Sequence, residues 1–393
     1  MMNSWSTCKH NKPLAEQAAS LYVHVPFCRA KCRYCDFYSL VPAPGQAEAF
    51  VEGVAIELDY YSQRLQHPLE TVFIGGGTPT SLPLPLLERL LATVGKYVNR
   101  STEFSVEANP STVTASTAEL LRAAGVNRVN IGAQSFLNAD LAAISRIHTP
   151  DQARRAVGFC RRAGIENVGL DLIYGLPGQT PATWQYSLAA ALALAPAHLS
   201  CYALSYEPHT PLADDLARGK VAEMNEDDQR KCYYAAIDAA TDAGLEHYEI
   251  SNFARPGFRC RHNLTYWENR PYVGLGPAAA SYLHGVRRTN TPDLQAWIAA
   301  MRRRQPAPAS QETLNRRASM AETVMLSLRL AEGIDRKLFA WRFGEDVVNA
   351  FHQPVSRYHS QGALEVSPSH LRLTRQAMFV ADTVLADIIA AVD

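Results

Sequence analysis

Apolar and polar positions follow one repeating pattern over the first half of the chain. A short, apolar, β-rich run is followed by polar or glycine-rich residues and then by a stretch with helical periodicity. The runs that predict strands cover residues 21–27, 71–74, 103–106, 128–131, 167–173 and 198–204. The stretches that predict helices cover residues 47–65, 84–98, 115–124, 151–163 and 183–194. Strands and helices that alternate in this way imply parallel strands joined by right-handed crossovers.

Six strand–helix units suit an α/β fold built on a partial (β/α)6 barrel of the TIM type, and an open doubly wound sheet is the alternative. The polar and glycine-rich motifs come just after the strands, so in a parallel barrel they gather at one face, where active sites lie. The pattern is lost after Asp214. The later segments predict a charged helix (225–243), an aromatic and polar stretch (248–282), a linker (305–310), a small, mainly helical domain from residue 318, and a β-hairpin (371–380). We therefore expect an N-terminal tail (1–20), a barrel (21–245), the aromatic segment with the linker (246–310) and a C-terminal domain (311–393).

Composition narrows the classes of function. The 393 residues are 47% hydrophobic and 19% charged, which is typical of a globular protein, and the formal net charge is zero. No basic excess indicates a nucleic-acid partner. The first twenty residues hold no apolar core of signal-peptide length, and no apolar run approaches the ~18 residues that cross a bilayer, so we expect a cytoplasmic protein. Of the eight cysteines only three cluster, which in a long cytosolic chain indicates a metal site more than disulfides.

The clustered cysteines, Cys28, Cys32 and Cys35, lie in a loop after the first predicted strand. A cubane iron–sulfur cluster has four irons that each take an external ligand, usually a thiolate. Three cysteines leave one iron open for a small molecule. The alternatives are a structural zinc ion, with His24 or Cys8 as the fourth ligand, and a set of buried thiols. Zinc sites favour paired cysteine spacings and no second pair is present, so the pattern favours a [4Fe–4S] cluster.

The spacing Cys-x3-Cys-x2-Cys, with an aromatic residue before the last cysteine, resembles the radical S-adenosylmethionine (SAM) superfamily. The resemblance implies that the open iron binds the amino and carboxylate groups of SAM. It also implies that one-electron reduction cleaves SAM to a 5′-deoxyadenosyl radical.

Motifs after the later strands extend this comparison. The glycines of residues 75–79 let a ligand approach the backbone closely. An arginine such as Arg146 can pair with a carboxylate, and an aspartate such as Asp171 can accept hydrogen bonds from ribose hydroxyls. Taken alone, Glu107 is better explained as a solvated strand end, and His148 is equally well explained as a satisfied structural histidine.

Together these motifs resemble the oxygen-independent coproporphyrinogen III oxidase-like branch of the superfamily, and within it the HemW family of haem chaperones. The resemblance runs from Leu21 to about Tyr282 and continues weakly to the C-terminus. It implies that Tyr34 lies beside the cluster. It also implies a SAM pocket lined by Tyr22, Gly76, Gly77, Thr78, Glu107, Gln134, Arg146 and Asp171.

Two positions separate the oxidases from the chaperones. The oxidases carry a further cysteine two residues after the triad, and here that position is Phe37, which argues against coproporphyrinogen oxidase activity. Residues 262–267 resemble the His-Asn-x-x-Tyr-Trp motif of the HemW family, and a histidine is a suitable axial ligand for haem iron. From the residues alone, His262 can instead bond to its neighbours while Tyr266 and Trp267 fill a seam between domains.

The resemblance therefore implies a chaperone that binds haem and passes it to haem proteins such as cytochromes, with a [4Fe–4S] cluster and SAM in the barrel. The alternatives are a radical SAM oxidoreductase acting on a porphyrinogen, and a cluster-dependent scaffold. Ala280 departs from the family, which usually has histidine there, and Ser145 stands where glycine is common. The sequence leaves open the haem recipient, the oligomeric state, whether SAM is cleaved or only bound, and whether arginines at 302–304 or 316–317 contact a membrane.

Overall fold

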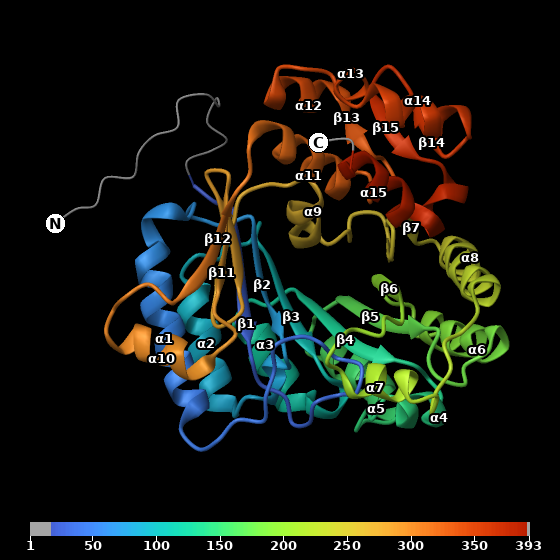
Figure 1. The fold of residues 1–393 in the computed structure, drawn as a ribbon. Coiled ribbons are helices and arrows are strands. Elements are labelled where there is room, and N and C mark those ends of the chain that lie inside the picture. The colour runs from blue at the N-terminus through green and yellow to red at the C-terminus, as the bar shows by residue number, and fades with distance from the viewer. Residues whose placement is uncertain (1–16, 391–393) are drawn as a thin grey trace.

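The computed structural model describes residues 17–390, so most of the predicted N-terminal tail, with Cys8, lies outside the described residues. All six predicted strands form, and they run parallel in chain order (Figure 1). They are β1 (Ser20–Val25), β2 (Thr71–Gly76), β3 (Glu103–Ala108), β4 (Arg128–Gln134), β5 (Asn167–Tyr174) and β6 (His198–Ala203). The predicted helices form as α1 (Gln46–Tyr61), α2 (Leu84–Gly95), α3 (Ala115–Ala123), α5 (Pro150–Arg162) and α6 (Pro181–Leu192). A short helix that was not predicted, α4 (Asn138–Ala143), follows β4.

Local sequence explains where two of these helices begin. α5 and α6 each start at a proline that follows a threonine, Thr149 or Thr180, whose side chain accepts a hydrogen bond from the third helical residue. In both helices the side chain of that third residue also bonds the threonine backbone, which completes a capping box. A cap of this kind stabilises a helix by about 1 kcal/mol, so both helices begin at defined positions.

The six parallel strands form the middle of a larger mixed sheet. Within the described residues its order is β12-β11-β10-β9-β1-β2-β3-β4-β5-β6-β8-β7. The added strands are β7 (Glu246–Glu249), β8 (Asn252–Ala254), β9 (Tyr272–Leu275), β10 (Ala280–Leu283), β11 (Val286–Asn290) and β12 (Ala309–Thr313). Only β9 joins in parallel, beside β1, and the others are antiparallel. The two outermost strands do not pair with each other, so the sheet stays open, and the predicted α/β fold with a partial barrel is confirmed.

The later part of the chain departs from the predicted segments. Residues 309–310, which we predicted in a linker, belong to β12, and this strand crosses the predicted domain start at residue 311. All residues of β12 are exposed, so its sequence lacks the apolar alternation that reveals a strand. The predicted hairpin lies earlier, as β14 (Leu364–Val366) and β15 (His370–Leu373). The charged helix is confirmed as α8 (Glu226–Asp242).

Alternate residues of the parallel strands point to opposite faces of the sheet. Val23 and Val106 face outward and are fully buried in the core beneath the helices. Tyr22, Glu107 and Asp171 occupy the other set of positions and face the interior of the partial barrel, which is called the lumen below. The lumen is therefore lined by polar and aromatic side chains.

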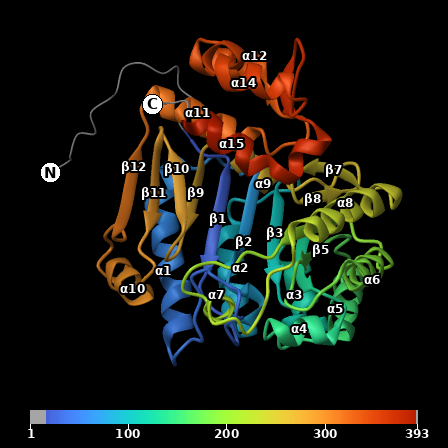
Figure 2. The ribbon, with the colours of Figure 1, turned by 45° about the vertical axis from the view of Figure 1, so that its right-hand side comes forward.

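The two ends of the barrel carry different elements (Figure 2). α7 (Pro211–Ala217) and the loop after β1 lie at the carboxyl ends of the parallel strands. α9 (Arg261–Trp267) and the C-terminal region lie at the amino ends. That region contains α11 (Arg316–Ser327), β13 (Ile334–Asp335), α12 (Arg336–Phe343), α13 (Val347–Ala350), α14 (His352–Ser360) and α15 (Ala381–Ala390), while α10 (Leu294–Arg302) packs on α1. None of the helices within residues 17–390 combines the length and apolar character needed to cross a membrane.

Candidate cluster and cofactor site

The three clustered cysteines lie in a loop of residues 28–40, called the cluster loop below. Its two ends are joined by backbone hydrogen bonds, from Cys28 N–H to the Leu40 carbonyl at 3.0 Å and from Leu40 N–H to the Pro26 carbonyl at 2.9 Å. Cys28, Cys32 and Cys35 are partly exposed within it. The sequence prediction of one cysteine-bearing loop at the carboxyl end of β1 is therefore confirmed.

The donors around the cysteines fit an iron–sulfur cluster. Thr78 Oγ1 lies 3.5 Å from Cys28 Sγ, and Arg146 Nη1 donates to Cys32 Sγ at 3.5 Å. Hydrogen bonds to sulfur are one of the means by which proteins tune cluster potentials. Burial raises the pKa of Cys35 to about 11, and a bound metal favours the thiolate form of a cysteine.

The zinc alternative has less support. Within residues 17–390, no three His, Cys, Asp or Glu side chains converge closely enough to hold a single metal ion. His24, one candidate for a fourth ligand, uses both ring nitrogens, with Nδ1 3.0 Å from the Tyr22 hydroxyl and Nε2 2.8 Å from the Tyr38 carbonyl. A structural zinc ion needs a fourth ligand besides the three cysteines, and His24 has no free ring nitrogen to supply it.

An ion pair ties the cluster loop across the mouth of the lumen. Arg33 pairs with Asp215 of α7, whose carboxylate also lies 3.5 Å from Lys220 Nζ. The Leu212 N–H at the start of α7 donates to the Arg33 carbonyl at 3.0 Å. The loop is thus held at its neck by β1 and at its far side by α7. Sequence reasoning missed Asp215, since no local motif marks it.

The glycine motif after β2 docks the residues that lead from β1 into the cluster loop. Gly77 N–H donates to the Val25 carbonyl at 2.8 Å, and Thr78 N–H donates to the Phe27 carbonyl at 2.6 Å. A Cβ on Gly77 would lie 2.6 Å from that same Phe27 oxygen, so only glycine fits. We expected these glycines to admit a ligand, and here they admit the protein's own backbone. Gly76 adopts a φ of 97° and donates its N–H to Glu107 Oε2 at 3.1 Å.

Two carboxylates face the lumen just below this mouth. Burial raises the pKa of Glu107 to about 8, the nearby Asp171 raises it further, and the Gly76 N–H opposes both effects. Burial also raises the pKa of Asp171 to about 6, against a 2.6 Å hydrogen bond from Ser200 and the positive charges of two arginines. Both groups can therefore hold protons or hydrogen-bond a ligand near neutral pH.

Unpartnered polar atoms show that the mouth can hold a polar ligand. The Oε1 atom of Gln134 and the Nε atom of Arg146 are buried and lack a hydrogen-bond partner. Gln134 also has a φ of 64°, a conformation that residues other than glycine rarely adopt. Tyr34 lies close enough to Arg146, Cys32 and Asp171 for all three to influence its pKa, which burial raises. The predicted SAM-pocket residues are thus brought together, and their free donors and acceptors fit SAM.

The lumen below the mouth holds polar side chains that sequence reasoning missed. Arg128 is fully buried, yet its Nε and Nη2 atoms have no partner, and Asn130 Oδ1 is likewise unsatisfied. Gly169 makes room there, since a Cβ would lie 2.5 Å from Asn130 Oδ1. Arg128 and Asn130 share one face of β4 with Gly132 and Gln134. This period of two was the signal available in the sequence.

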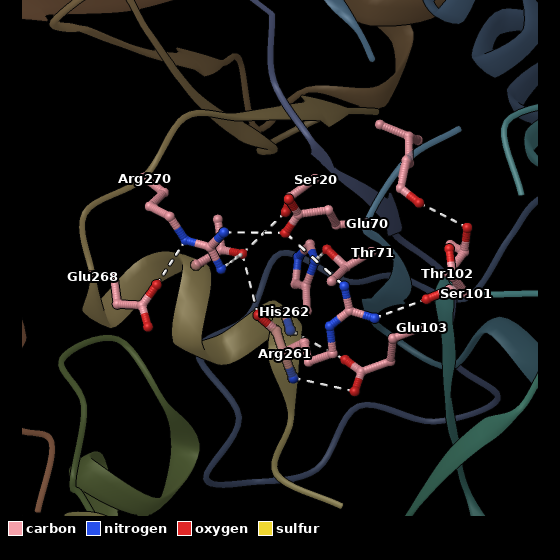
Figure 3. A network of polar contacts seen from close by, with 12 residues as sticks. Ser20, Glu70, Thr71, Ser101, Thr102, Glu103, Arg261, His262, Glu268 and Arg270 are labelled. Atoms are coloured by element: carbon pink, nitrogen blue, oxygen red, sulfur yellow. Dashed lines mark hydrogen bonds and ion pairs between the residues drawn. The ribbon is translucent and has the colours of Figure 1, made fainter. Parts of the chain in front are cut away.

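His262 lies at the opposite end of the barrel, where α9 meets the first residues of β1–β3 (Figure 3). Its Nδ1 is 2.7 Å from Thr71 Oγ1 and its Nε2 is 2.8 Å from the Tyr266 hydroxyl. The backbone N–H of His262 donates to Glu103 Oε1 at 3.1 Å, and its ring stacks on Phe73. Burial lowers the pKa of His262 to about 3, so the ring is neutral. These contacts favour the structural alternative, because neither ring nitrogen is free to bind iron.

The structure also places Trp267 and the two residues that depart from the family pattern, Ser145 and Ala280. Trp267 meets the C-terminal region, with its carbonyl accepting from Ser327 Oγ at 2.9 Å, which supports the predicted seam. Ser145 has a φ of 56°, which explains why glycine is common at this position. Ala280 lies in β10, paired with Thr289.

Comparison with known proteins gives consistent relatives. The Radical SAM superfamily model matches residues 22–190, and the HemN C-terminal domain model matches residues 314–380. The chain is 38% identical to the haem chaperone HemW of Synechocystis sp., covering 80% of this chain and 78% of that protein. It is 32% identical to the haem chaperone HemW of Bacillus subtilis, covering 93% and 97%. The structure also superposes on coproporphyrinogen III oxidase (HemN) from Escherichia coli, a radical SAM enzyme, with a TM-score of 0.81 at 21% identity. The superposition covers 96% of this chain and 91% of that one, and at this identity it shows the fold alone.

Proposed function

The chain belongs to the HemW family of the radical SAM superfamily, and from this premise we propose that it binds haem and delivers it to haem proteins such as cytochromes. The observation that carries the proposal is identity that extends over nearly the full length of a haem chaperone, 97% in the Bacillus subtilis protein. Phe37 supports the proposal, because it stands at the position where the oxidases carry a further cysteine. Phe37 is also 62% exposed, so this position does not close the cluster site.

In this proposal Cys28, Cys32 and Cys35 hold a [4Fe–4S] cluster, which when bound supplies an open iron for SAM and an electron for its cleavage. Arg146 and Gln134 offer unpartnered atoms to the polar groups of SAM. Tyr22, Glu107 and Asp171 line the lumen beneath, and the backbone of residues 77–78 holds the entry to the loop in place.

The resemblance assigns the haem iron to His262, and this assignment needs a rearrangement. Iron can reach Nε2 only after the Tyr266 hydroxyl, now 2.8 Å away, moves aside. Because His262 is buried and Tyr266 partly buried, that movement also opens the packing of α9 against the strands. Haem binding and the place of its ligand are therefore separate questions.

We place the activity in the cytoplasm. The seven cysteines within the described residues are all free, as expected of a reducing compartment. Peripheral membrane contact has two candidate surfaces, the exposed arginines at 302–304 at the end of α10 and those at 316–317 at the start of α11. Basic residues of this kind each contribute about 1 kcal/mol next to an anionic leaflet.

A porphyrinogen oxidoreductase is the second candidate, and the lumen favours it. The unpartnered guanidinium atoms of Arg128 offer donors for a carboxylate of a small substrate, and Asn130 Oδ1 offers an acceptor beside them. Anaerobic incubation with reductant, SAM and coproporphyrinogen III separates the candidates. Loss of carbon dioxide from the substrate together with formation of 5′-deoxyadenosine supports the oxidase, and the absence of both products contradicts it.

The proposal itself is tested by titrating the anaerobically purified, cluster-reconstituted chain with ferric haem while following the Soret absorption. A chaperone gives binding that saturates at a defined ratio of haem to chain. A Soret band that only rises linearly, without saturation, contradicts the proposal.

A further inference from the structure

Asp215 is a buried carboxylate on α7, the helix that lies at the mouth of the lumen (Figure 2). Only 6% of the residue is exposed, and its carboxylate faces two cations, Arg33 and Lys220. The Lys220 ammonium lies 3.5 Å away on a side chain that is 61% exposed, and the pair with Arg33 is the shorter of the two. A carboxylate taken out of water is costly unless a cation pairs with it. The burial of Asp215 therefore depends on Arg33 staying in place.

Arg33 is held by its backbone as well as by its side chain. It stands between Cys32 and Tyr34 in the cluster loop. Its N–H donates to the Ile144 carbonyl at 3.4 Å, and its carbonyl accepts from the Leu212 N–H at 3.0 Å. Ile144 directly follows α4, and Leu212 is the second residue of α7. Two segments that are distant in the sequence thus fix this one residue of the loop.

A small apolar cluster lies beside these contacts and is separate from the main core. Its buried members come from α7 and from the ends of α4, β5 and β6, and they are Ile144, Ile173, Leu176, Leu204 and Leu212. The partly buried ring of Tyr34 packs against them. Because these side chains join α7 both to the cluster loop and to the end of α4, a displacement of α7 disturbs both segments.

The two neighbours of Arg33 in the chain both lie near Arg146. Cys32 Sγ accepts a hydrogen bond from Arg146 Nη1 at 3.5 Å. Burial raises the pKa of Tyr34, and the nearby positive charge of Arg146 opposes this effect. Arg146 itself is anchored on the sheet, since its Nη2 donates to the Gly132 carbonyl at 2.5 Å. The placement of Cys32 against this anchored arginine therefore depends on where Arg33 holds the loop.

We propose that Asp215 is a positioning residue for SAM. Through Arg33 it holds Cys32, and with it the cluster, at the correct place relative to Arg146. Its own ion pairs are to Arg33 and Lys220, outside the predicted SAM pocket, so it sets the affinity for SAM from a distance. The inference rests on the proposed function, because it takes SAM binding between the cluster and Arg146 as given.

The test measures SAM binding and iron content separately on full-length, cluster-reconstituted chains. SAM affinity is measured by equilibrium dialysis and by the change that SAM causes in the electron paramagnetic resonance spectrum of the dithionite-reduced cluster. We expect Asp215→Asn and Arg33→Gln to keep the iron content of wild type and to bind SAM about tenfold more weakly, because the site is no longer preorganised. Asp214→Asn, a change at an exposed residue of the same helix, is the matched control and should bind SAM like wild type.

Two more variants separate positioning from a general loss of structure. The double variant Asp215→Asn/Arg33→Gln should bind SAM no more weakly than either single variant, because all three lack the same pair. Arg33→Lys keeps the positive charge and should recover part of the affinity that Arg33→Gln loses. Should Asp215→Asn fail to fold, the two Arg33 variants decide, since that side chain is 38% exposed.

Each outcome decides a different question. SAM affinity that stays at the wild-type value in Asp215→Asn and Arg33→Gln overturns the positioning role. Iron that is lost in proportion to SAM binding also overturns it, because the pair then holds the cluster itself. Effects of the two changes that add in the double variant overturn the role of their pairing. Wild type that carries its full iron content but binds no SAM refutes the SAM site of the proposed function, and the role of Asp215 falls with it.

Discussion

The buried carboxylate of Glu107 makes the cleanest physical prediction. Its pKa is raised from 4.5 to about 8, first by burial and then by Asp171. Between those two pH values the unfolded chain releases the proton and the folded chain keeps it, so rising pH favours the unfolded state through this group. The gap corresponds to roughly 5 kcal/mol at about 1.4 kcal/mol per pKa unit. Water in the lumen screens the charge and reduces this free-energy difference, so we expect an effect of roughly 2–3 kcal/mol on the free energy of unfolding.

Glu107→Gln removes the titration but keeps an oxygen that can accept from the Gly76 N–H. The variant should therefore unfold at higher urea than wild type at pH 9, by roughly 2–3 kcal/mol in the free energy of unfolding, and match wild type near pH 4.5. Tryptophan fluorescence of the cluster-free chain gives both unfolding curves. Glu88→Gln, an exposed change on α2, is the control and should differ from wild type at neither pH. A difference that is equal at both pH values, or a variant less stable at pH 9, refutes the reasoning.

Three further predictions follow from single residues. Cys35→Ser should abolish the absorbance of the reconstituted cluster, whereas Cys201→Ser, a buried thiol outside the loop, should keep it; a cluster that survives the first change contradicts the ligand assignment. Gly77→Ala places a Cβ 2.6 and 2.8 Å from two backbone oxygens and should lower the free energy of unfolding by about 2–3 kcal/mol. Gly95→Ala is the control and should change little, because its Cβ meets nothing within 4 Å. Equal urea midpoints for the two variants count against the docking role of Gly77. Ser145→Gly relieves a φ of 56° and should raise the free energy of unfolding by about 1 kcal/mol in the same assay, and a lower value is the contrary result.

The sequence was sufficient for the parallel strands and most of their helices, because apolar alternation and capping residues are local signals. The cysteine loop and the glycine motif also lie where their place after a strand predicted them. The exposed strand β12 was missed because pairing alone, without an apolar face, holds it to the sheet.

The partners of site residues were harder to predict because they come from distant parts of the chain. His262 meets Thr71, which lies 191 positions earlier, and this contact turns a candidate ligand into a buried anchor of α9. Arg33 meets Asp215 on a helix that no motif connects with the cluster loop. The lumen contacts of Arg128 and Asn130 depend equally on how the strands are placed beside each other.

The most direct test of the account is haem transfer from the loaded chain. In a stopped-flow experiment, the haem-loaded, cluster-reconstituted chain is mixed anaerobically with rising concentrations of an apo-b-type cytochrome, and the Soret change is followed. The account predicts that the transfer rate rises with the acceptor concentration, because the acceptor meets the chaperone while haem is still bound. A rate that stays at the value of spontaneous haem release at every acceptor concentration contradicts delivery and leaves only a haem-binding protein.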